Sequence, residues 1–373
     1  MVATPTTRLK PRVTPLAPKD TVNYPVRMNR CLLGVFLGLC AFGSRAAAQA
    51  GAGAPVLSFP ISARSAGMGE TGVADNTDPD NLYYNPANAV GRPSIYIEGS
   101  RWDLLPEFNS DVWIGGMRGG ARWNSGDRVR WGADFAYSRL DYGESITTDP
   151  SGMPIGEVHP IEEYFALTGG VGLAVGNRGE LRIGSAVKRV NVDYGRDDLG
   201  GIPDAKADTY AFDIGATFAF PASLGEWTVV PALATAFINL GPDLDFPNGN
   251  SDPLPTRFNF GTSVRVVSPT VRLFAADVPV VTVVYNVEGT DRWHNDDFSW
   301  AIGSELTVVD MLYVRAGITD FHNDMSYERE SDPGWGVGFG LPIGPVRARF
   351  DFTKSPNYIS EEKKYGAALE WLL

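Results

Sequence analysis

The clearest candidate for chemistry is the run GMGETG at residues 67–72, which spells G-x-G-x-x-G, the glycine pattern of dinucleotide-binding sites. Such glycines bind a pyrophosphate when a buried strand precedes them and a helix follows. Here a short apolar run with a proline precedes them, and a stretch rich in Asp, Asn and Pro, unfavourable to helix, follows. The acidic residue expected about 20 positions later falls in AVGRP. The pattern therefore does not predict nucleotide binding.

Other residue types that could do chemistry are scattered along the chain. The histidines His159, His294 and His322 show no H-E-x-x-H spacing, and no serine lies in a G-x-S-x-G turn. The stretch PDLDFPNGNSD offers oxygen ligands between Asp243 and Asp252 but lacks the terminal Glu of a calcium-binding EF-hand loop. We interpret it as a solvated acidic loop and predict no enzyme, cofactor or metal site, with a hydrolase built on a loop histidine as the alternative.

The N-terminus has the features of a secretory signal peptide at residues 28–50. A basic region MNR, the apolar core CLLGVFLGLCAF and a small-residue AAA site follow one another, and we expect cleavage after Ala48 or Ala50. Residues 1–27 precede a complete signal, so we interpret them as an over-extended N-terminus with Met28 as the true initiator. The apolar core is shorter than the roughly 20 residues of a spanning helix, which makes a membrane anchor the weaker alternative.

Composition narrows the class of protein. The net charge of −12 argues against a nucleic-acid partner, which needs a clustered basic face. The only two cysteines, Cys31 and Cys40, lie in the segment expected to be removed, so the mature chain has no disulfide and no thiolate metal site. After residue 50 no apolar run is long enough for a membrane helix. An exported chain rich in glycine and aromatics leaves a soluble β protein or an outer-membrane barrel.

Period-2 alternation predicts strands throughout the rest of the chain. In VRARFDFTK (346–354) and DTYAFDIGATFAF (208–220), apolar side chains alternate with polar or small ones. We predict 14 strands, near residues 93–103, 110–121, 129–140, 162–176, 180–194, 207–220, 227–239, 256–267, 271–286, 297–309, 311–320, 334–342, 345–354 and 364–373.

Strand length and loop rhythm favour the barrel over a soluble sandwich. Most strands reach the roughly 9–11 residues that a tilted membrane strand needs. Short connections between predicted strands alternate with long polar ones. Outer-membrane barrels show the same alternation of short periplasmic turns and longer outer loops. Trp123, Trp131 and Trp227 lie at the short-turn ends, as an interfacial girdle would. Much of the acidic surplus falls in the outer loops, at Asp197, Asp198, Asp243, Asp245, Asp296, Asp297, Glu328 and Glu330.

We therefore predict an all-β, transmembrane antiparallel β-barrel over residues 93–373, in the outer membrane of a Gram-negative-type bacterium and surrounded by its lipid. A barrel of about 14 strands would be hollow unless something filled it. Residues 51–92 precede the alternating pattern and are the natural plug. The glycine run GWGVGFG (334–340) places glycines on one face of a strand, which indicates close approach of another backbone; we interpret that backbone as the plug.

Residues 62–89 of the plug segment read SARSAGMGETGVADNTDPDNLYYNPANA. This stretch resembles the N-terminal signature of the PorV/PorQ family of outer-membrane proteins, itself similar to FadL-type fatty-acid channels. The sequence departs from that signature at two places. Glu70-Thr71 stands where Gly-Ala is usual. Asn88 stands where Gly is usual, and Asn can take the left-handed conformation that Gly takes. The matching residues are Ala63, Arg64, Gly67, Met68, Gly69, Gly72, Val73, Asp78, Tyr84, Asn85, Pro86 and Ala87. The resemblance implies a 14-stranded barrel with this segment inside it.

Roles follow for individual residues. We expect the plug glycines to pack against the wall, Arg64 and Asp78 to pair with lumen charges, and Asn85-Pro86 to form a turn. The C-terminal strand resembles the signal recognised by the barrel assembly machinery, through Lys364, Gly366, Leu369, Trp371 and Leu373.

Three functions remain open from the sequence. The first is PorV-like participation in protein export, as in type IX secretion, with secreted client proteins held by the outer loops. The second is FadL-like passive transport of hydrophobic small molecules, with lumen residues Arg315, Arg347 and Arg349 attracting a carboxylate. The third is a purely structural barrel.

Overall fold

The computed structural model describes residues 52–104, 106, 111–148, 151–176, 179–195, 205–293, 297–323, 328–356 and 361–373. Several sequence-based predictions lie outside these residues: the N-terminal extension 1–27, the signal peptide 28–50, and the loop residues Asp197, Asp198, His294 and Asp296. In the described part, no helix is both long enough and apolar enough to span a membrane.

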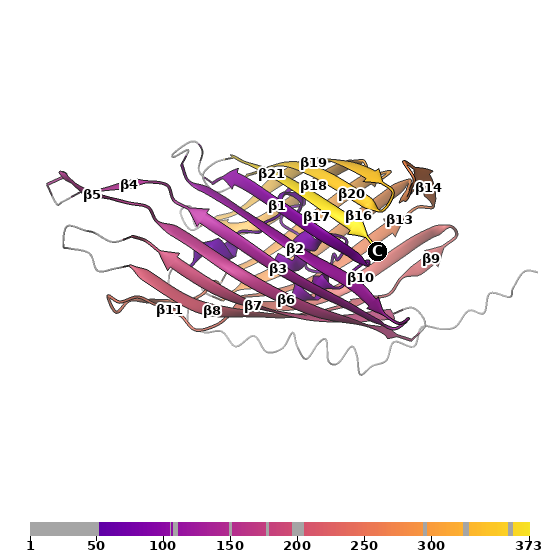
Figure 1. Ribbon diagram of the computed structural model, residues 1–373, viewed down its shortest axis with the longest axis horizontal. Coiled ribbons are helices and arrows are strands. Elements are labelled where there is room, and N and C mark those ends of the chain that lie inside the picture. Colours follow the sequence, from indigo (N-terminus) through magenta and orange to yellow (C-terminus); the bar gives the residue numbers. More distant parts are fainter. Residues whose placement is uncertain are drawn as a thin grey trace, which may run out of the picture. The chain divides into compact units, whose positions relative to one another are not determined.

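Fourteen antiparallel strands form a closed barrel in the described part of the chain (Figure 1). Each strand pairs with its neighbours in chain order, and the first pairs with the last, from Ser94 opposite Leu372 to Arg101 opposite Tyr365. Closure leaves no open sheet edge facing lipid, where backbone groups would find no partner. The strands are β1 (Ser94–Asp103), β2 (Trp113–Ser125), β3 (Val129–Asp141), β6 (Ile161–Val175), β7 (Gly179–Asp193), β8 (Lys206–Ala219), β10 (Trp227–Leu240), β13 (Arg257–Val267), β16 (Val281–Arg292), β17 (Asp297–Val308), β18 (Leu312–Asn323), β19 (Glu328–Ile343), β20 (Val346–Pro356) and β21 (Glu361–Leu372).

The two ends of the barrel differ in their connections. At one end the connections are short, as at 126–128, 309–311 and 344–345, or carry the small strand β9 (Ala222–Leu224). At the other end they carry the hairpins β4 (Ser145–Thr148) with β5 (Pro154–Val158) and β11 (Leu244–Asp245) with β12 (Ser251–Asp252). Figure 1 shows β4 and β5 projecting beyond the wall. Since outer-membrane barrels keep short turns in the periplasm, the first end is the periplasmic end and the second the outer end.

One predicted strand was wrong. The stretch 271–286 does not cross as a unit, because β14 (Thr270–Leu273) and β15 (Ala276–Pro279) form a separate hairpin at the periplasmic end. The wall strand β16 begins only at Val281. Phe274 and Ala275 at the hairpin tip have positive φ, as a two-residue turn that follows the right-handed strand twist requires. The apolar positions change from odd to even numbers across this turn, from Val271 and Leu273 to Ala276 and Val278, which pair with each other. This change of parity is the sign of the break that the single predicted strand overlooked.

Two strands extend further outward than expected. β18 runs on to Asn323 and β19 starts at Glu328, with their backbones paired as far as Asn323 opposite Glu328. Glu328 and Glu330 therefore lie in a strand and not in a loop as predicted. Beyond the lipid a strand needs only its backbone ladder, so polar side chains can continue it without an apolar face.

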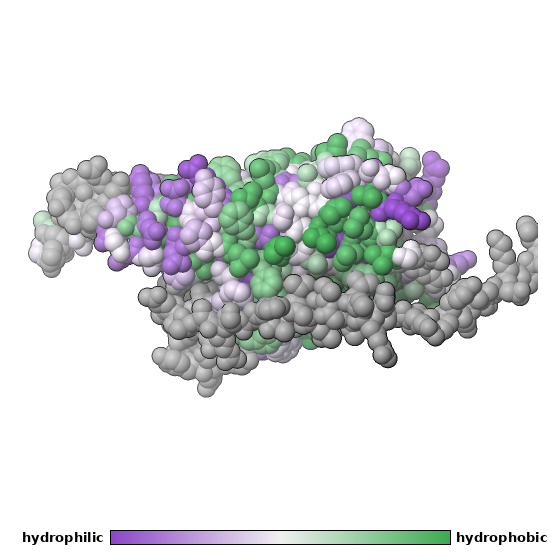
Figure 2. Space-filling view, turned by 90° about the horizontal axis from the view of Figure 1, so that it is seen from below, coloured by the Kyte–Doolittle hydropathy of each residue, from purple (hydrophilic) through white to green (hydrophobic). Residues whose placement is uncertain are grey.

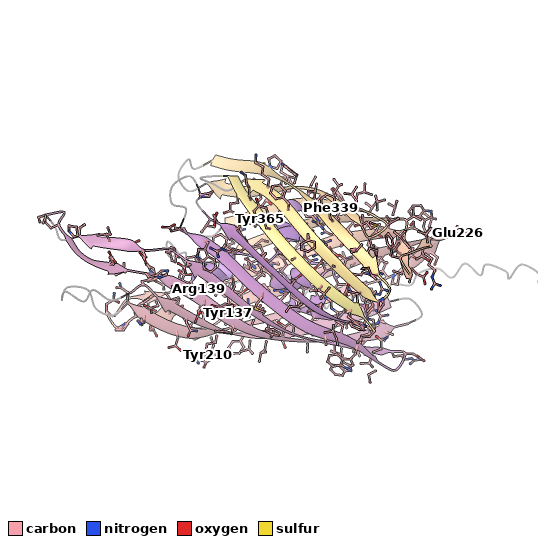
Figure 3. All side chains as sticks on the ribbon, turned by 45° about the horizontal axis from the view of Figure 1, so that its top comes forward. Tyr137, Arg139, Tyr210, Glu226, Phe339 and Tyr365 are labelled. Carbon is pink, nitrogen blue, oxygen red and sulfur yellow. The ribbon has the colours of Figure 1, made fainter. Side chains whose placement is uncertain are left out.

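The two faces of the wall follow the alternation. On β8, Tyr210, Phe212 and Ile214 are each about half exposed on the outside, whereas the intervening Asp213 faces inward and is buried. Figure 2 shows hydrophobic side chains gathered over the middle of the wall, with hydrophilic ones at the ends. In Figure 3, Tyr210, Phe339 and Tyr365 lie on the outer surface of the barrel. Trp123, Trp131 and Trp227 are also exposed, toward the periplasmic ends of their strands.

A closed barrel with an apolar outer surface has one stable environment, a lipid bilayer, because its outward side chains would otherwise meet water. The chain is an outer-membrane β-barrel of fourteen strands.

Candidate functional site

Residues 52–92 lie inside the barrel, where Figure 1 shows them as the indigo segment within the wall. They run from the outer end, where the Gly53 amide donates to the Pro253 carbonyl over 2.8 Å, to the periplasmic start of β1. Four short helices build this segment: η1 (Pro55–Ser58), α2 (Ala63–Gly67), η2 (Pro79–Tyr83) and η3 (Pro86–Ala89). The Asn85 side chain caps η3 by accepting from the Ala87 amide, so Asn85-Pro86 starts a helical turn.

Glycines in the wall let the plug backbone approach closely. A Cβ added at Gly184 would lie 2.2 Å from the carbonyl oxygen of Pro86, and one at Gly317 would lie 2.1 Å from the carbonyl carbon of Met68. Neither distance is possible for a real side chain. The wall therefore needs glycine at these two positions as long as the segment stays in place.

The glycines of the GMGETG run also allow the plug to pack closely against the wall. Gly67 lies against Gly336 of β19, and a Cβ at Gly67 would be 3.2 Å from the Gly336 Cα. Gly334, two residues earlier on the same face, lies next to the Ala66 carbonyl. Gly69 has φ of 64°, in the left-handed region that favours glycine. The run 334–340 thus meets another backbone at Gly334 and Gly336, as the alternation of glycines indicated.

Arg64 is the centre of a buried charge network. Its Nε and Nη2 each donate to a Glu305 carboxylate oxygen over 2.9 Å, and Nη2 also donates to Asp75 over 3.1 Å. Asp78 lies 3.7 Å from Nε, and the guanidinium is 1% exposed. Burial opposes the charge, but Glu305, Asp75 and Asp78 together raise the pKa of Arg64 well above its usual value. Two wall-to-plug hydrogen bonds on one planar group fix the orientation of helix α2.

The wall continues the network on the other side of these carboxylates. Arg315 Nε donates to Glu305 over 2.5 Å, and its Nη1 donates to Asp351 over 2.6 Å. Arg349 donates to Asp351 over 2.6 Å and also contacts Asp78 of the plug. The expected pairing of Arg64 and Asp78 with lumen charges is therefore present, and it joins three strands to the plug.

The three lumen arginines proposed from the sequence are engaged by the protein itself. Arg315 and Arg349 belong to the network above, and Arg347 lies 3.1 Å from Asp310 at the periplasmic turn. Because each has a carboxylate partner from the chain, their charges are compensated. This arrangement does not support the expectation that they attract the carboxylate of a ligand.

Side-chain amides and a buried glutamate hold the middle of the plug. Asn85 Nδ2 donates to the Val73 carbonyl over 2.9 Å, and Asn88 Nδ2 donates to the Gly72 carbonyl over 2.9 Å. Glu288 of the wall accepts from the amides of Gly72 and Val73 over 2.8 and 2.7 Å. Backbone groups far from water are thus satisfied without regular secondary structure.

The two departures from the family signature behave differently. Glu70 is the residue with positive φ, 58°, at the place where glycine is usual. Asn88 does not use the left-handed conformation considered from the sequence, because it lies within helix η3 and contributes its amide instead.

The outer half of the lumen is an apolar chamber filled by the start of the plug. Val56 and Leu57 are buried there among wall side chains such as Trp102 and Leu140. Glu162 is the buried acid in this region, and it accepts hydrogen bonds from the Val56 amide, Tyr142 and Tyr194. We call this region the apolar chamber; it comprises Ala54, Val56, Leu57, Ile61, Trp102, Leu104, Val112, Ile114, Ala136, Leu140, Tyr164, Ala166, Val190, Val192, Ala207, Ala211, Leu244 and Leu254.

The periplasmic end holds a different space, with a cavity volume of about 290 Å³. Arginines dominate its charged lining: Arg128, Arg130, Arg182 and Arg265, against the two acids Asp127 and Glu180. We call it the arginine cavity.

The C-terminal strand divides its residues between the two faces. Lys364 points inward, with its Nζ 3.1 Å from Glu362 and 4.7 Å from the Trp102 ring centre, and Gly366 lies against Ala63 of the plug. Leu369, Trp371 and Leu373 are exposed on the outer surface.

The outer loops show no catalytic or metal-binding cluster in the part of the chain that the structure describes. His159 Nε2 lies 2.6 Å from Asp141, and Asp245 of the acidic loop accepts from Ser251. No group of three or more His, Cys, Asp or Glu residues among the described positions could hold a metal ion.

Comparisons with known proteins concern the fold. No protein-family model matches the chain, and no curated protein matches it. Solved structures similar to it include a Pseudomonas aeruginosa FadL homologue (TM-score 0.42, 12% identity, 83% of this chain and 97% of that one) and the Pseudomonas putida toluene transporter TodX (0.48, 12%, 82% and 96%). The Ralstonia pickettii toluene transporter TbuX is a third (0.43, 11%, 84% and 97%). Membership of the PorV/PorQ family stays a prediction.

Sequence reasoning missed the acids that hold the plug. Glu288, Glu305 and Glu162 lie on inward faces of wall strands, and the inward positions next to each of them along the strand are uncharged. One signal could have pointed to these three acids. It is an isolated acid on the lumen face of a strand, opposite a plug that carries an arginine or free amides.

Proposed function

We propose that the protein is a passive channel for small hydrophobic molecules, in which the start of the plug occupies the binding chamber until a ligand displaces it. The apolar chamber carries this proposal. A barrel that only needs to be filled could use polar side chains and water, whereas this lumen becomes apolar under the outer loops. The displaceable part is residues 54–61, which lack regular strand pairing with the wall.

The charges of the lumen limit what the chamber accepts. Arg315 and Arg349 are engaged by the chain's own carboxylates, and Glu162 places an acid beside Val56. Two lysines contact chamber aromatics, and each is paired with an acid of the chain: Lys188 with Asp213 and Lys364 with Glu362. A fatty-acid carboxylate would therefore compete with these acids for a cation. The arrangement therefore favours neutral molecules, such as aromatic hydrocarbons, over long-chain acids.

A disulfide lock tests whether the segment must move. A Cβ at Gly53 would lie 2.9 Å from the Asp252 Cβ, so the two backbones must separate by roughly 1 Å to reach the roughly 3.5–4.5 Å between the Cβ atoms of a disulfide. Gly53→Cys with Asp252→Cys should, when oxidised, stop uptake of a neutral aromatic probe into proteoliposomes, and reductant should restore it. Gly53→Cys alone is the control. Equal uptake in the oxidised and reduced states, or none above empty vesicles, would contradict the channel.

A second candidate is export, with client proteins bound at the outer end, as in the PorV-like hypothesis. The hairpin β4–β5 favours it, because this hairpin projects beyond the wall with Ile146 and Met153 each about two-thirds exposed. Apolar side chains held away from lipid suit a protein contact. Purification from membranes without added ligand separates the candidates: a stoichiometric secreted protein that is lost on Ile146→Ser with Met153→Ser supports export, and a bound apolar molecule supports the channel.

A further inference from the structure

The arginine cavity at the periplasmic end takes no part in either function above, and its charges are not balanced. Four arginines and two acids line it, which leaves a net charge of +2 in one space. The arginines come from separate parts of the wall, with Arg130 on β3, Arg182 on β7 and Arg265 on β13. Folding has therefore brought like charges together, which is unfavourable unless an anion compensates them.

The hydrogen bonds of Arg182 show the deficit directly. Its Nε and Nη2 both donate to the same oxygen of Glu180, over 2.8 and 2.7 Å, while Nη1 has no hydrogen-bond partner. The side chain is only 4% exposed, so water does not replace the missing partner freely. The other Glu180 oxygen lies 3.4 Å from Arg130. Glu180 is thus already shared between two guanidinium groups.

Arg265 and Arg128 add charge without adding a partner. Within the described residues, neither guanidinium makes a hydrogen bond or an ion pair, and both line the cavity. Arginine presents its donors in a planar fork that matches the oxygens of a phosphate group. A tetrahedral oxyanion could accept from guanidinium groups on different strands at once, whereas a single carboxylate offers two coplanar oxygens.

We propose that the arginine cavity binds a small dianion of the phosphate-monoester type at the periplasmic mouth of the barrel. The net charge of +2 matches a dianion. A phosphodiester, such as a phospholipid headgroup, carries one negative charge and therefore leaves one positive charge of the cavity uncompensated. The volume of about 290 Å³ accommodates a small metabolite. The site opens toward the periplasm and is separated from the apolar chamber by the plug, so it is independent of the ligand proposed there.

Calorimetric titration of the full-length barrel in detergent, at fixed ionic strength and pH 7.5, tests the site. Glycerol 3-phosphate should bind at least about tenfold more tightly than dimethyl phosphate, which tests the diester, and than succinate, which tests a dicarboxylate. Arg265→Gln and Arg182→Gln should each weaken the binding about tenfold or more. Arg265→Gln leaves both close ion-pair partners of Glu180, Arg130 and Arg182, in place, so it separates the site from the local ion pairs.

Arg189→Gln is the matched control, since Arg189 lies on β7 with an exposed side chain and the same change of charge. Heat-modifiable gel migration checks that each variant is a folded barrel. The proposal is overturned if glycerol 3-phosphate gives no saturable heat, if Arg189→Gln weakens binding as much as Arg265→Gln, or if the diester or succinate binds equally well.

Discussion

Single side chains decide how the plug is held. Arg64 reaches from the plug to Glu305, 241 positions later, and buries its charge among Glu305, Asp75 and Asp78. Removing one member of such a group leaves the others charged and desolvated, which costs more than the lost hydrogen bonds. Gly184 and Gly317 act by having no side chain, because the plug backbone occupies the space where a Cβ would be.

Arg64→Gln should lower the free energy of unfolding by about 3–5 kcal/mol, because the facing carboxylates lose their cation. Unfolding in urea from lipid vesicles, followed by tryptophan fluorescence, measures the change. Arg272→Gln, on the exposed face of hairpin β14–β15, is the matched control and should stay within about 0.5 kcal/mol of the wild type. Equal stability of the Arg64 variant and the control would show that the network does not hold the plug.

The strands form the next scale, where alternation predicts most of the architecture. The faces of β8, β20 and β21 follow from their sequence, because successive side chains of any strand point to opposite sides. The single strand predicted over 271–286 was wrong, since a two-residue hairpin shifts the alternation by one position, and that shift between Leu273 and Ala276 was overlooked. Alternation also underestimated the lengths of β18 and β19, because the outer ends of these strands have a polar sequence and are paired through their backbones.

Phe135→Arg tests the lipid-facing surface of a strand. Phe135 is exposed at the middle of β3, where a cation would sit near the bilayer midplane and cost about 2–4 kcal/mol of unfolding free energy. Trp227→Arg, at the periplasmic start of β10, should cost about 0–1 kcal/mol, because the interface is close. The same urea unfolding measures both. A cost that does not depend on depth would place the membrane elsewhere on the barrel.

At the largest scale, the described part of the chain is a closed barrel with residues 52–92 inside it. A closed sheet of this strand number leaves a lumen that wall side chains alone do not fill, and the plug with its chamber and network occupies that lumen. The two ends differ, with an apolar chamber under the outer loops and the arginine cavity at the periplasmic turns.

Deleting residues 53–89 should open a pore. Planar-bilayer recordings should show a large, steady conductance for the deletion and a small one for the wild type, because the closed wall no longer encloses the plug. Deleting 145–158, the β4–β5 hairpin outside the wall, is the control and should leave conductance at the wild-type level. If the plug deletion folds, as heat-modifiable migration would show, but conducts no more than the wild type, the plug does not close the lumen.

The sequence by itself determined the class of fold, its orientation and the segment of interest. Strand alternation, turn lengths and the glycine-rich stretch after the predicted signal peptide are local features, and each can be read within a window of a few residues. Local features also distinguish the GMGETG run from a nucleotide-binding site, because no buried strand precedes it and no helix-forming stretch follows it.

Only the tertiary structure decided which charges meet and what fills the lumen. Barrel closure places Arg64 beside Glu305, and the amides of Gly72 and Val73 beside Glu288, although these pairs are more than 200 residues apart. It also showed that Arg315, Arg347 and Arg349 each have a carboxylate partner within the chain. By contrast, Arg182 shares Glu180 with Arg130, and Arg265 forms no ion pair among the described residues. Alternation shows that a side chain points inward, but the partner it meets depends on the register and closure of the whole sheet.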